Sequence, residues 1–171
     1  MILESGFYTY GGNMYTIEVS MSASELKWAR YFFDLIKVIK SKSKDPNTKV
    51  GCVLVGNNKQ ILSTGYNDFP FGVKNNPSRR KRPRKYSYTV HAEANCLLLA
   101  ARSGVTTNNT TLYVQALPCN ECTKLIIQSG IKRIIYEKSE WAKWKSQKYN
   151  EEHMKISLEM LNEAKIEIIG V

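Results

Sequence analysis

Apolar side chains recur at helical spacing near the start of the chain and predict a helix over residues 24–40. Ser22 and Glu25 match a capping box, in which each side chain accepts a hydrogen bond from the backbone of the other residue, and they mark where this helix begins. A stripe this regular is typical of a helix face that packs against a core. Its members are Leu26, Ala29, Phe33 and Ile36, and Phe32, Leu35 and Ile39 widen it.

Beyond this helix, short apolar segments alternate with helical ones and predict an α/β domain. The first two apolar segments are separated by a polar turn and predict a hairpin. Because strands that alternate with helices are joined by crossovers, we expect a mixed sheet, parallel in its second half, with helices on both faces. The predicted strands are residues 50–55, 60–66, 110–115, 131–136 and 165–169, and the later helices are 91–103, 119–129 and 150–164.

Three segments fall outside this pattern. Residues 1–21 have little helical periodicity, so we expect an N-terminal extension, or an added edge strand, ahead of a single domain at 22–171. The connection formed by residues 67–88 is longer than loops without a function usually are in a compact domain, and we expect it to form a wall of the active site. No element is predicted for the polar segment that carries Trp141 and Trp144.

Two short motifs bring together the residue types that bind zinc. His91 is followed two residues later by Glu93, and Cys119 and Cys122 follow a proline one helical turn apart. One imidazole nitrogen and two thiolates suit Zn²⁺, with the fourth tetrahedral position left for water. The remaining histidine and cysteines are not spaced to supply a fourth ligand, so the sequence predicts an open, catalytic zinc site. Those residues are His153, Cys52 and Cys96.

Each of these residues also has a simpler explanation when taken alone. The Cys119–Cys122 pair could be a redox or structural pair, His91 a helix cap, and Glu93 a first-turn acid that complements the helix dipole. Their combination, His-x-Glu followed by Pro-Cys-x-x-Cys, is the pattern of zinc-dependent nucleobase deaminases. In that pattern Glu93 carries protons between the water and a substrate nitrogen.

Charge is concentrated in one short segment. The formal net charge is +10, and six of the positive side chains lie within residues 79–85. Such a run is a solvated loop, a site for the phosphates of a nucleotide or effector, or a surface for a polynucleotide. Composition does not separate these three.

The cysteines and the apolar runs indicate the compartment. Two of the four cysteines belong to the metal motif and two lie within apolar segments, which fits a reducing cytoplasm. No apolar run approaches the length of a membrane span, and the first residues lack the basic and apolar regions of a secretion signal. We therefore expect a cytoplasmic protein.

Taken together, these segments resemble the deoxycytidylate (dCMP) deaminases of the zinc-dependent cytidine deaminase superfamily over residues 24–169. The two metal motifs are specific for the superfamily, and the Gly-Tyr-Asn-x-Phe-Pro-x-Gly-Val stretch indicates the dCMP branch. The resemblance is carried by residues 43–51, 65–73, 91–95, 118–122 and 160–164.

The resemblance implies a three-layer α/β/α sandwich with a five-stranded mixed sheet and hydrolysis of dCMP to dUMP and ammonia. It implies that Glu93 is the proton shuttle and that Asn67 bonds the sugar. The backbone at Ala116 and Leu117 would accept from the leaving amino group. It also implies a hexamer that is activated by dCTP with Mg²⁺ and inhibited by dTTP.

The chain departs from the family pattern in three ways. Residues 67–88 contain no Cys or His, with which some relatives build a second zinc site, so we expect one zinc per chain. Phe71 stands where the pattern often has arginine, so effector contacts do not transfer there. The basic run exceeds what the resemblance requires, and we expect it to receive substrate or effector phosphates. The candidates are Arg80, Arg82, Arg84 and Lys85.

Several alternatives stay open from the sequence. The substrate could be dCTP, a 5-substituted dCMP or a base in a polynucleotide, since all share the same chemistry. A free cytidine deaminase is disfavoured, because that branch usually has cysteine where His91 stands. A non-enzymatic alternative is a zinc-stabilised module that binds nucleic acid through the basic run.

Overall fold

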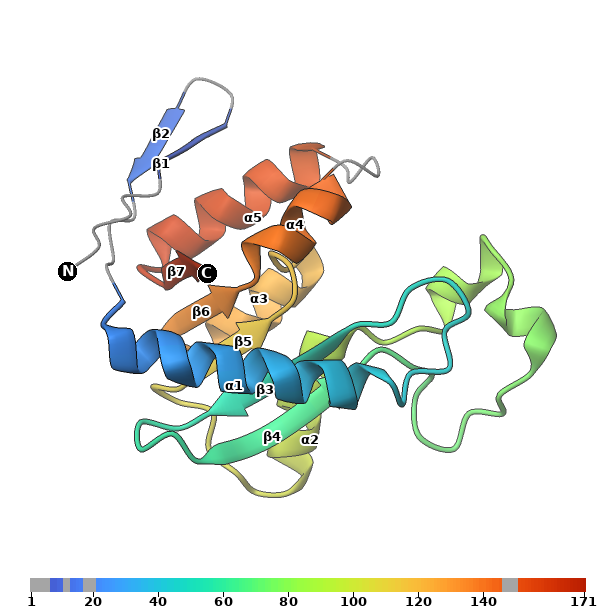
Figure 1. Ribbon diagram of the computed structural model, residues 1–171. Helices are drawn as coiled ribbons and strands as arrows, with labels where there is room; N and C mark the ends of the chain where they lie inside the picture. Colours follow the sequence, from blue (N-terminus) through green and yellow to red (C-terminus); the bar gives the residue numbers. More distant parts are fainter. Residues whose placement is uncertain (1–6, 11–12, 17–20, 146–150) are drawn as a thin grey trace.

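A five-stranded mixed sheet forms the centre of the protein (Figure 1). The computed structural model describes residues 7–10, 13–16, 21–145 and 151–171. The strands of the sheet are β3 (Gly51–Val55), β4 (Ile61–Tyr66), β5 (Thr111–Val114), β6 (Arg133–Tyr136) and β7 (Glu167–Gly170). Their spatial order is β4-β3-β5-β6-β7. β3 is antiparallel to both of its neighbours, whereas β5, β6 and β7 run parallel, as the alternation of strands and helices predicts.

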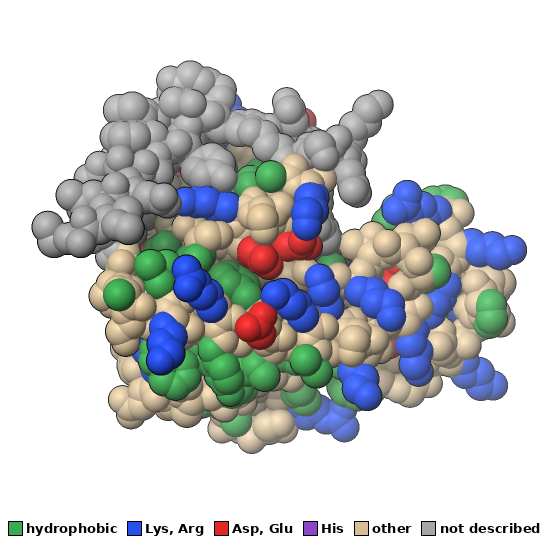
Figure 2. Space-filling model, in the orientation of Figure 1, with side chains coloured by type: hydrophobic (Ala, Val, Ile, Leu, Met, Phe, Trp, Pro, Cys, Tyr) green, Lys and Arg blue, Asp and Glu red, His purple; other side chains and the backbone are tan. Residues whose placement is uncertain are grey.

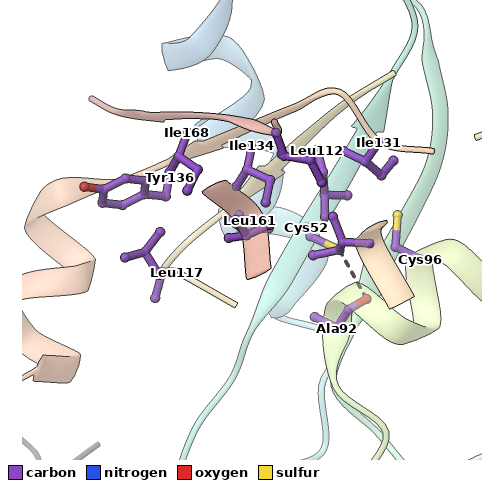
Figure 3. Close-up of a cluster of buried hydrophobic side chains, with 14 of the residues drawn as sticks. Cys52, Ala92, Cys96, Leu112, Leu117, Ile131, Ile134, Tyr136, Leu161 and Ile168 are labelled. Atoms are coloured by element: carbon purple, nitrogen blue, oxygen red, sulfur yellow. Dashed lines mark hydrogen bonds between the residues drawn. The ribbon is translucent and has the colours of Figure 1, made fainter. Parts of the chain in front are cut away.

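Helices cover both faces of this sheet and complete the three-layer α/β/α sandwich. Alternate residues of β3 point to opposite faces, so Val53 packs toward one helix layer and Leu54 toward the other. The first layer is α1, and the second contains α2, α3 and α5 around the larger core cluster (Figure 3). These helices are α1 (Ala23–Lys40), α2 (Ala92–Arg102), α3 (Asn120–Gln128) and α5 (Glu151–Glu163).

The capping box at the start of α1 is confirmed. Ser22 Oγ accepts a hydrogen bond from the Glu25 N–H at 3.2 Å, and a Glu25 carboxylate oxygen accepts from the Ser22 N–H at 2.9 Å. The buried residues Ala29, Phe32, Phe33 and Ile36 all belong to the predicted stripe, and Leu26 at its start is half-buried. The helix therefore begins where its sequence indicates and packs with its aromatic residues inward.

One helix was missed by the apolar pattern. Residues Lys138–Lys145 form α4, for which the sequence predicts no element because they are mostly polar. Trp141 is 4 % exposed and belongs to the larger core cluster, so this aromatic side chain anchors the described part of the helix. The side chain of Trp144 lies outside the described part of the chain.

The described part of the N-terminal segment contains a short hairpin. β1 (Phe7–Tyr10) and β2 (Asn13–Thr16) pair antiparallel with one another as a separate two-stranded sheet, and neither pairs with the central one. The division into an extension and a domain at 22–171 stays a prediction.

The long connection 67–88 projects from the body as a lobe (Figure 1, green). It contains two short 3₁₀ helices, Pro77–Arg80 and Arg84–Ser87. A two-way backbone bridge between Asp68 and Val90 closes the lobe at its base. None of the described helices has both the length and the apolar character needed to cross a membrane.

Candidate active site

Two helix starts converge at the site. His91 is the N-cap residue of α2, and Cys119 is the N-cap residue of α3. Neither makes a side-chain hydrogen bond to its own helix, so both side chains are free of capping and face one another instead. Cys122 lies in the first turn of α3, which brings its sulfur to the same place.

The three predicted ligands meet closely. His91 Nδ1 lies 3.4 Å from Cys119 Sγ and 3.5 Å from Cys122 Sγ. In the described part of the chain, the His, Cys and acidic side chains that come close enough to share one metal ion are these three. His153, Cys52 and Cys96 are not among them, so no fourth ligand joins this group from the residues that the structure describes.

These distances fit a zinc ion. With Zn–N and Zn–S bonds of about 2.05 and 2.3 Å in tetrahedral geometry, the nitrogen and each sulfur should be about 3.5 Å apart. The measured separations of 3.4 and 3.5 Å match that value. The donor set of one nitrogen and two sulfurs is also the one that zinc prefers. The residues present therefore fit zinc.

The two thiols of the site differ in how readily they lose a proton. The pKa of Cys119 is lowered to about 4, because Cys122 donates a hydrogen bond to its sulfur and His91 adds a second interaction, although burial opposes the shift. The pKa of Cys122 is raised, mainly by that same hydrogen bond to Cys119 and by burial. One thiolate thus exists in the pair even before a cation binds, and thiolates are the form that binds metal.

Glu93 lies beside the metal ligands without joining them. Its Oε2 atom is 3.7 Å from Cys122 Sγ, and the side chain is only 8 % exposed. Burial raises its pKa above the ordinary value for a glutamate, although the nearby charge of His91 opposes the shift. A carboxyl group with a raised pKa exchanges protons more readily near neutral pH, as a proton carrier requires.

A cavity of about 620 Å³ opens onto His91 and Glu93, and its volume suits a small-molecule ligand. His91 and Glu93 line it from the start of α2, and Ala116 and Leu117 line it from the segment that follows β5. The predicted wall from the connection 67–88 is confirmed. Its contributors are Asn67, Arg82, Lys85 and Tyr86.

Asn67 holds the wall of the cavity together. Its Oδ1 atom accepts a hydrogen bond from the Val50 N–H at 2.8 Å, and its Nδ2 atom donates to the Thr48 carbonyl at 2.9 Å. The amide is therefore largely committed to the protein, with one N–H left to offer to a ligand. The predicted sugar contact of Asn67 stays a prediction.

The four basic candidates divide into different environments. Arg80 bonds to Asp68 and lies over the Phe69 ring, and Lys85 is paired with Asp45, so both charges are neutralised within the protein. Arg84 lies near the Tyr88 ring and is not part of the cavity lining. Of these four candidates, Arg82 is the one that lines the cavity and has no acidic partner among the described residues. Figure 2 shows the exposed basic side chains gathered over this lobe.

Several residues at the cavity were not predicted as site residues, and Asp45 and Lys143 are two of them. Asp45 was noted only as part of a family motif, and its role depends on a lysine 40 residues away that no local pattern reveals. Lys143 lines the cavity from α4, the helix that the apolar pattern missed. Nothing in the sequence near Lys143 distinguishes it from other surface lysines.

Comparisons with known proteins agree with this geometry. A family model described as the cytidine and deoxycytidylate deaminase zinc-binding region matches residues 26–138. A probable deoxycytidylate deaminase of Caenorhabditis elegans is 40% identical over 116 residues, which are 66% of this chain and 58% of the relative. The deoxycytidylate deaminase of Homo sapiens is 38% identical over 117 residues, 65% of each chain. The matches thus span about 60% of the relatives' own length.

Solved structures share the fold. The dCMP deaminase of the cyanophage S-TIM5 in its apo form has a TM-score of 0.65 at 22% identity, over 88% of this chain and 100% of the other. A Thermotoga maritima diaminohydroxyphosphoribosylaminopyrimidine deaminase/reductase has a TM-score of 0.56 at 23% identity, over 85% of this chain and 37% of the other. With its His–Cys–Cys cluster inside the matched region, the chain belongs to the zinc-binding cytidine and deoxycytidylate deaminase family.

Proposed function

We propose that this protein hydrolyses dCMP to dUMP and ammonia. The observation that carries the proposal is a buried carboxyl group, Glu93, next to a three-ligand zinc cluster at the end of a nucleotide-sized cavity. The names of the Caenorhabditis elegans and Homo sapiens relatives support this substrate, as does the family match. A solved relative from cyanophage S-TIM5 was crystallised with dCMP and dUMP.

The residues of this chain can carry out the proton transfers. His91, Cys119 and Cys122 would hold the zinc ion, which when bound makes water a competent nucleophile near neutral pH. Glu93 takes a proton from the attacking water, passes it to N3 of the cytosine ring, and then protonates the departing amino group. The net reaction consumes one water molecule and releases one ammonia for each dCMP converted to dUMP.

The remaining lining residues orient the substrate in this proposal. The backbone at Ala116 and Leu117, which line the cavity, accepts a hydrogen bond from the cytosine amino group. The remaining N–H of Asn67 bonds the deoxyribose. Arg82 receives the 5′-phosphate, because among the four basic candidates it is the one at the cavity with no acidic partner.

Regulation and assembly are proposed by resemblance. We propose that a dCTP or dTTP effector binds with Mg²⁺ and that the basic run at residues 79–85 receives its phosphates. We propose that the protein forms a homo-oligomer, and by resemblance to the family we propose a hexamer. We also propose a cytoplasmic location, which is supported by four cysteines that form no disulfide.

The test is substrate turnover by the purified zinc-loaded protein. Separate incubations with dCMP, dCTP, cytidine, 5-methyl-dCMP and a cytosine-containing oligonucleotide would be followed by ammonia release and loss of cytosine absorbance. We expect dCMP to be the best substrate. Turnover of the oligonucleotide alone would instead identify a polynucleotide deaminase, and binding without ammonia release would overturn the enzymatic assignment.

A further inference from the structure

A buried ion pair joins two walls of the main cavity. Lys85 Nζ lies 2.8 Å from both carboxylate oxygens of Asp45, and the two side chains are 5 % and 4 % exposed. Both residues line the cavity, yet their opposite charges neutralise one another. A buried ion pair loses solvation, and an apolar pair of similar size is often as stable, so stability alone does not account for it.

On one side, Asp45 shapes the turn that holds Asn67. Its Oδ1 atom accepts hydrogen bonds from the Asn47 and Thr48 N–H groups at 2.8 and 2.9 Å. The Thr48 carbonyl then accepts from Asn67 Nδ2 at 2.9 Å. Ser43 Oγ accepts from the Asp45 N–H and donates to the Asn67 carbonyl. The position of Asn67 therefore depends on this turn through both its side chain and its backbone.

On the other side, Lys85 holds the end of the lobe. Its carbonyl accepts from Thr89 Oγ1 at 2.9 Å and from the Thr89 N–H at 3.0 Å. Thr89 also lines the cavity and lies two residues before His91. The ion pair thus connects the turn around Asp45 to the segment that leads into α2.

We propose that Asp45 and Lys85 are a positioning pair for substrate binding. By tying the lobe to the turn, the pair holds Asn67 and the adjoining wall in the arrangement that receives the sugar and phosphate of the nucleotide. Lys85 is thereby a positioning residue and not a phosphate ligand, in contrast to Arg82. The inference rests on the proposed deaminase function. Neither side chain is a metal ligand or takes part in the proton transfers of Glu93. Loss of the pair should therefore weaken substrate binding and leave the proton transfers intact.

The test compares steady-state kinetics of Lys85→Met with wild type. Methionine keeps the length of the apolar stem and removes the charge, and we expect KM for dCMP to rise about tenfold or more while kcat stays within about threefold. Lys85→Arg, which keeps the charge, should recover most of the affinity. The matched control is Lys37→Met, which breaks an exposed ion pair with Asp34 on α1 and should change neither parameter.

A double variant protects the test against misfolding. Lys85→Met leaves the Asp45 carboxylate buried without its cation, which can itself disturb folding. Asp45→Asn combined with Lys85→Met removes both charges. The asparagine amide oxygen can still accept the hydrogen bonds from the Asn47 and Thr48 N–H groups. Since both changes act through one contact, the double variant should show about the same KM increase as Lys85→Met alone. A folded double variant with wild-type KM, or one that loses kcat at unchanged KM, would overturn the proposal.

Hydrogen exchange separates this proposal from the deaminase assignment. If the wild-type protein releases no ammonia from dCMP, the proposed function fails, and the link between the pair and the wall can still be measured. We expect the amides of residues 47–50 and 67 to exchange about tenfold faster in Lys85→Met than in wild type or Lys37→Met. Unchanged exchange there would show that the pair does not hold the wall.

Discussion

Gly65 on β4 faces the carbonyl oxygen of Ala92 on α2 so closely that a Cβ atom at position 65 would lie 2.1 Å from that oxygen. The same atom would lie 2.6 Å from the Cys96 backbone nitrogen. Ala92 is itself held from β3, where Cys52 Sγ donates to its carbonyl at 3.1 Å (Figure 3). Because Ala92 stands between His91 and Glu93, the sheet sets the position of both functional side chains through this contact.

We expect Gly65→Ala to destabilise the protein by about 2 kcal/mol or more, since the obstacle is helix backbone and α2 must shift. The same shift should weaken zinc binding. Thermal unfolding and metal content after dialysis would measure both effects. Gly56→Ala is the control, because its Cβ would meet only the flexible end of the Gln60 side chain. Equal stability of the two variants would contradict the expectation.

Glu93→Gln should retain zinc and lose about 10²- to 10⁴-fold in kcat, because glutamine keeps the size of the side chain but carries no exchangeable carboxyl proton. Metal analysis and dCMP turnover check the two halves of this prediction. A variant that turns over normally would remove Glu93 from the proposed mechanism.

Arg82→Gln should raise KM for dCMP about tenfold, a loss of about 1.4 kcal/mol of binding, and have little effect on KM for deoxycytidine, which has no phosphate. Steady-state kinetics with dCMP and with deoxycytidine would measure the two KM values. Arg30→Gln, at an exposed position on α1, serves as the charge-matched control. An equal loss for both substrates would mean that Arg82 does not contact the phosphate.

Acid should weaken the protein through Asp45. Burial acts to raise the pKa of this carboxyl group, but hydrogen bonds from Lys85 and from the backbone of Thr48 and Asn47 lower it overall. A lowered folded-state pKa contributes stability that is complete above the ordinary value of about 3.9 and is lost as the pH falls through the folded-state value. Urea unfolding should therefore show the stability gap between wild type and Asp45→Asn narrowing below about pH 4. A gap that does not change with pH would contradict this.

Removing zinc should lower the melting temperature on the order of 10 °C, because a metal that binds only the folded chain stabilises it by mass action. The first turns of α2 and α3 have no side-chain cap of their own, so they should lose order first. Chelation followed by circular dichroism would measure the change. Zinc should restore the original value and Mg²⁺ should not, since the donors are two sulfurs and an imidazole.

The three zinc-binding side chains were predictable because they lie in two short sequence motifs. His91 and Glu93 are two residues apart, and Cys119 and Cys122 are three apart, so each half of the site can be recognised without knowing the fold. The strands were predictable for a related reason, since each buried strand is a continuous apolar segment.

The basic run was not predictable in the same way. Arg80, Arg82, Arg84 and Lys85 are equivalent in composition, and what distinguishes them is where an acidic residue lies in space. The partner of Lys85 is 40 residues away along the chain, at Asp45. Helix α4 was missed because its sequence is mostly polar, and among its described side chains Trp141 is the one that is buried.

The backbone bridge between Asp68 and Val90 closes the lobe where it leaves the body. The phosphate contact proposed for Arg82 lies beyond this bridge, whereas Glu93 lies outside the lobe. Phosphate recognition and proton chemistry are thus carried by different segments of the chain. Replacing the residues between Asp68 and Val90, with the acidic partners of positions 80 and 85 kept, should therefore alter phosphate recognition and leave the reactive centre as it is.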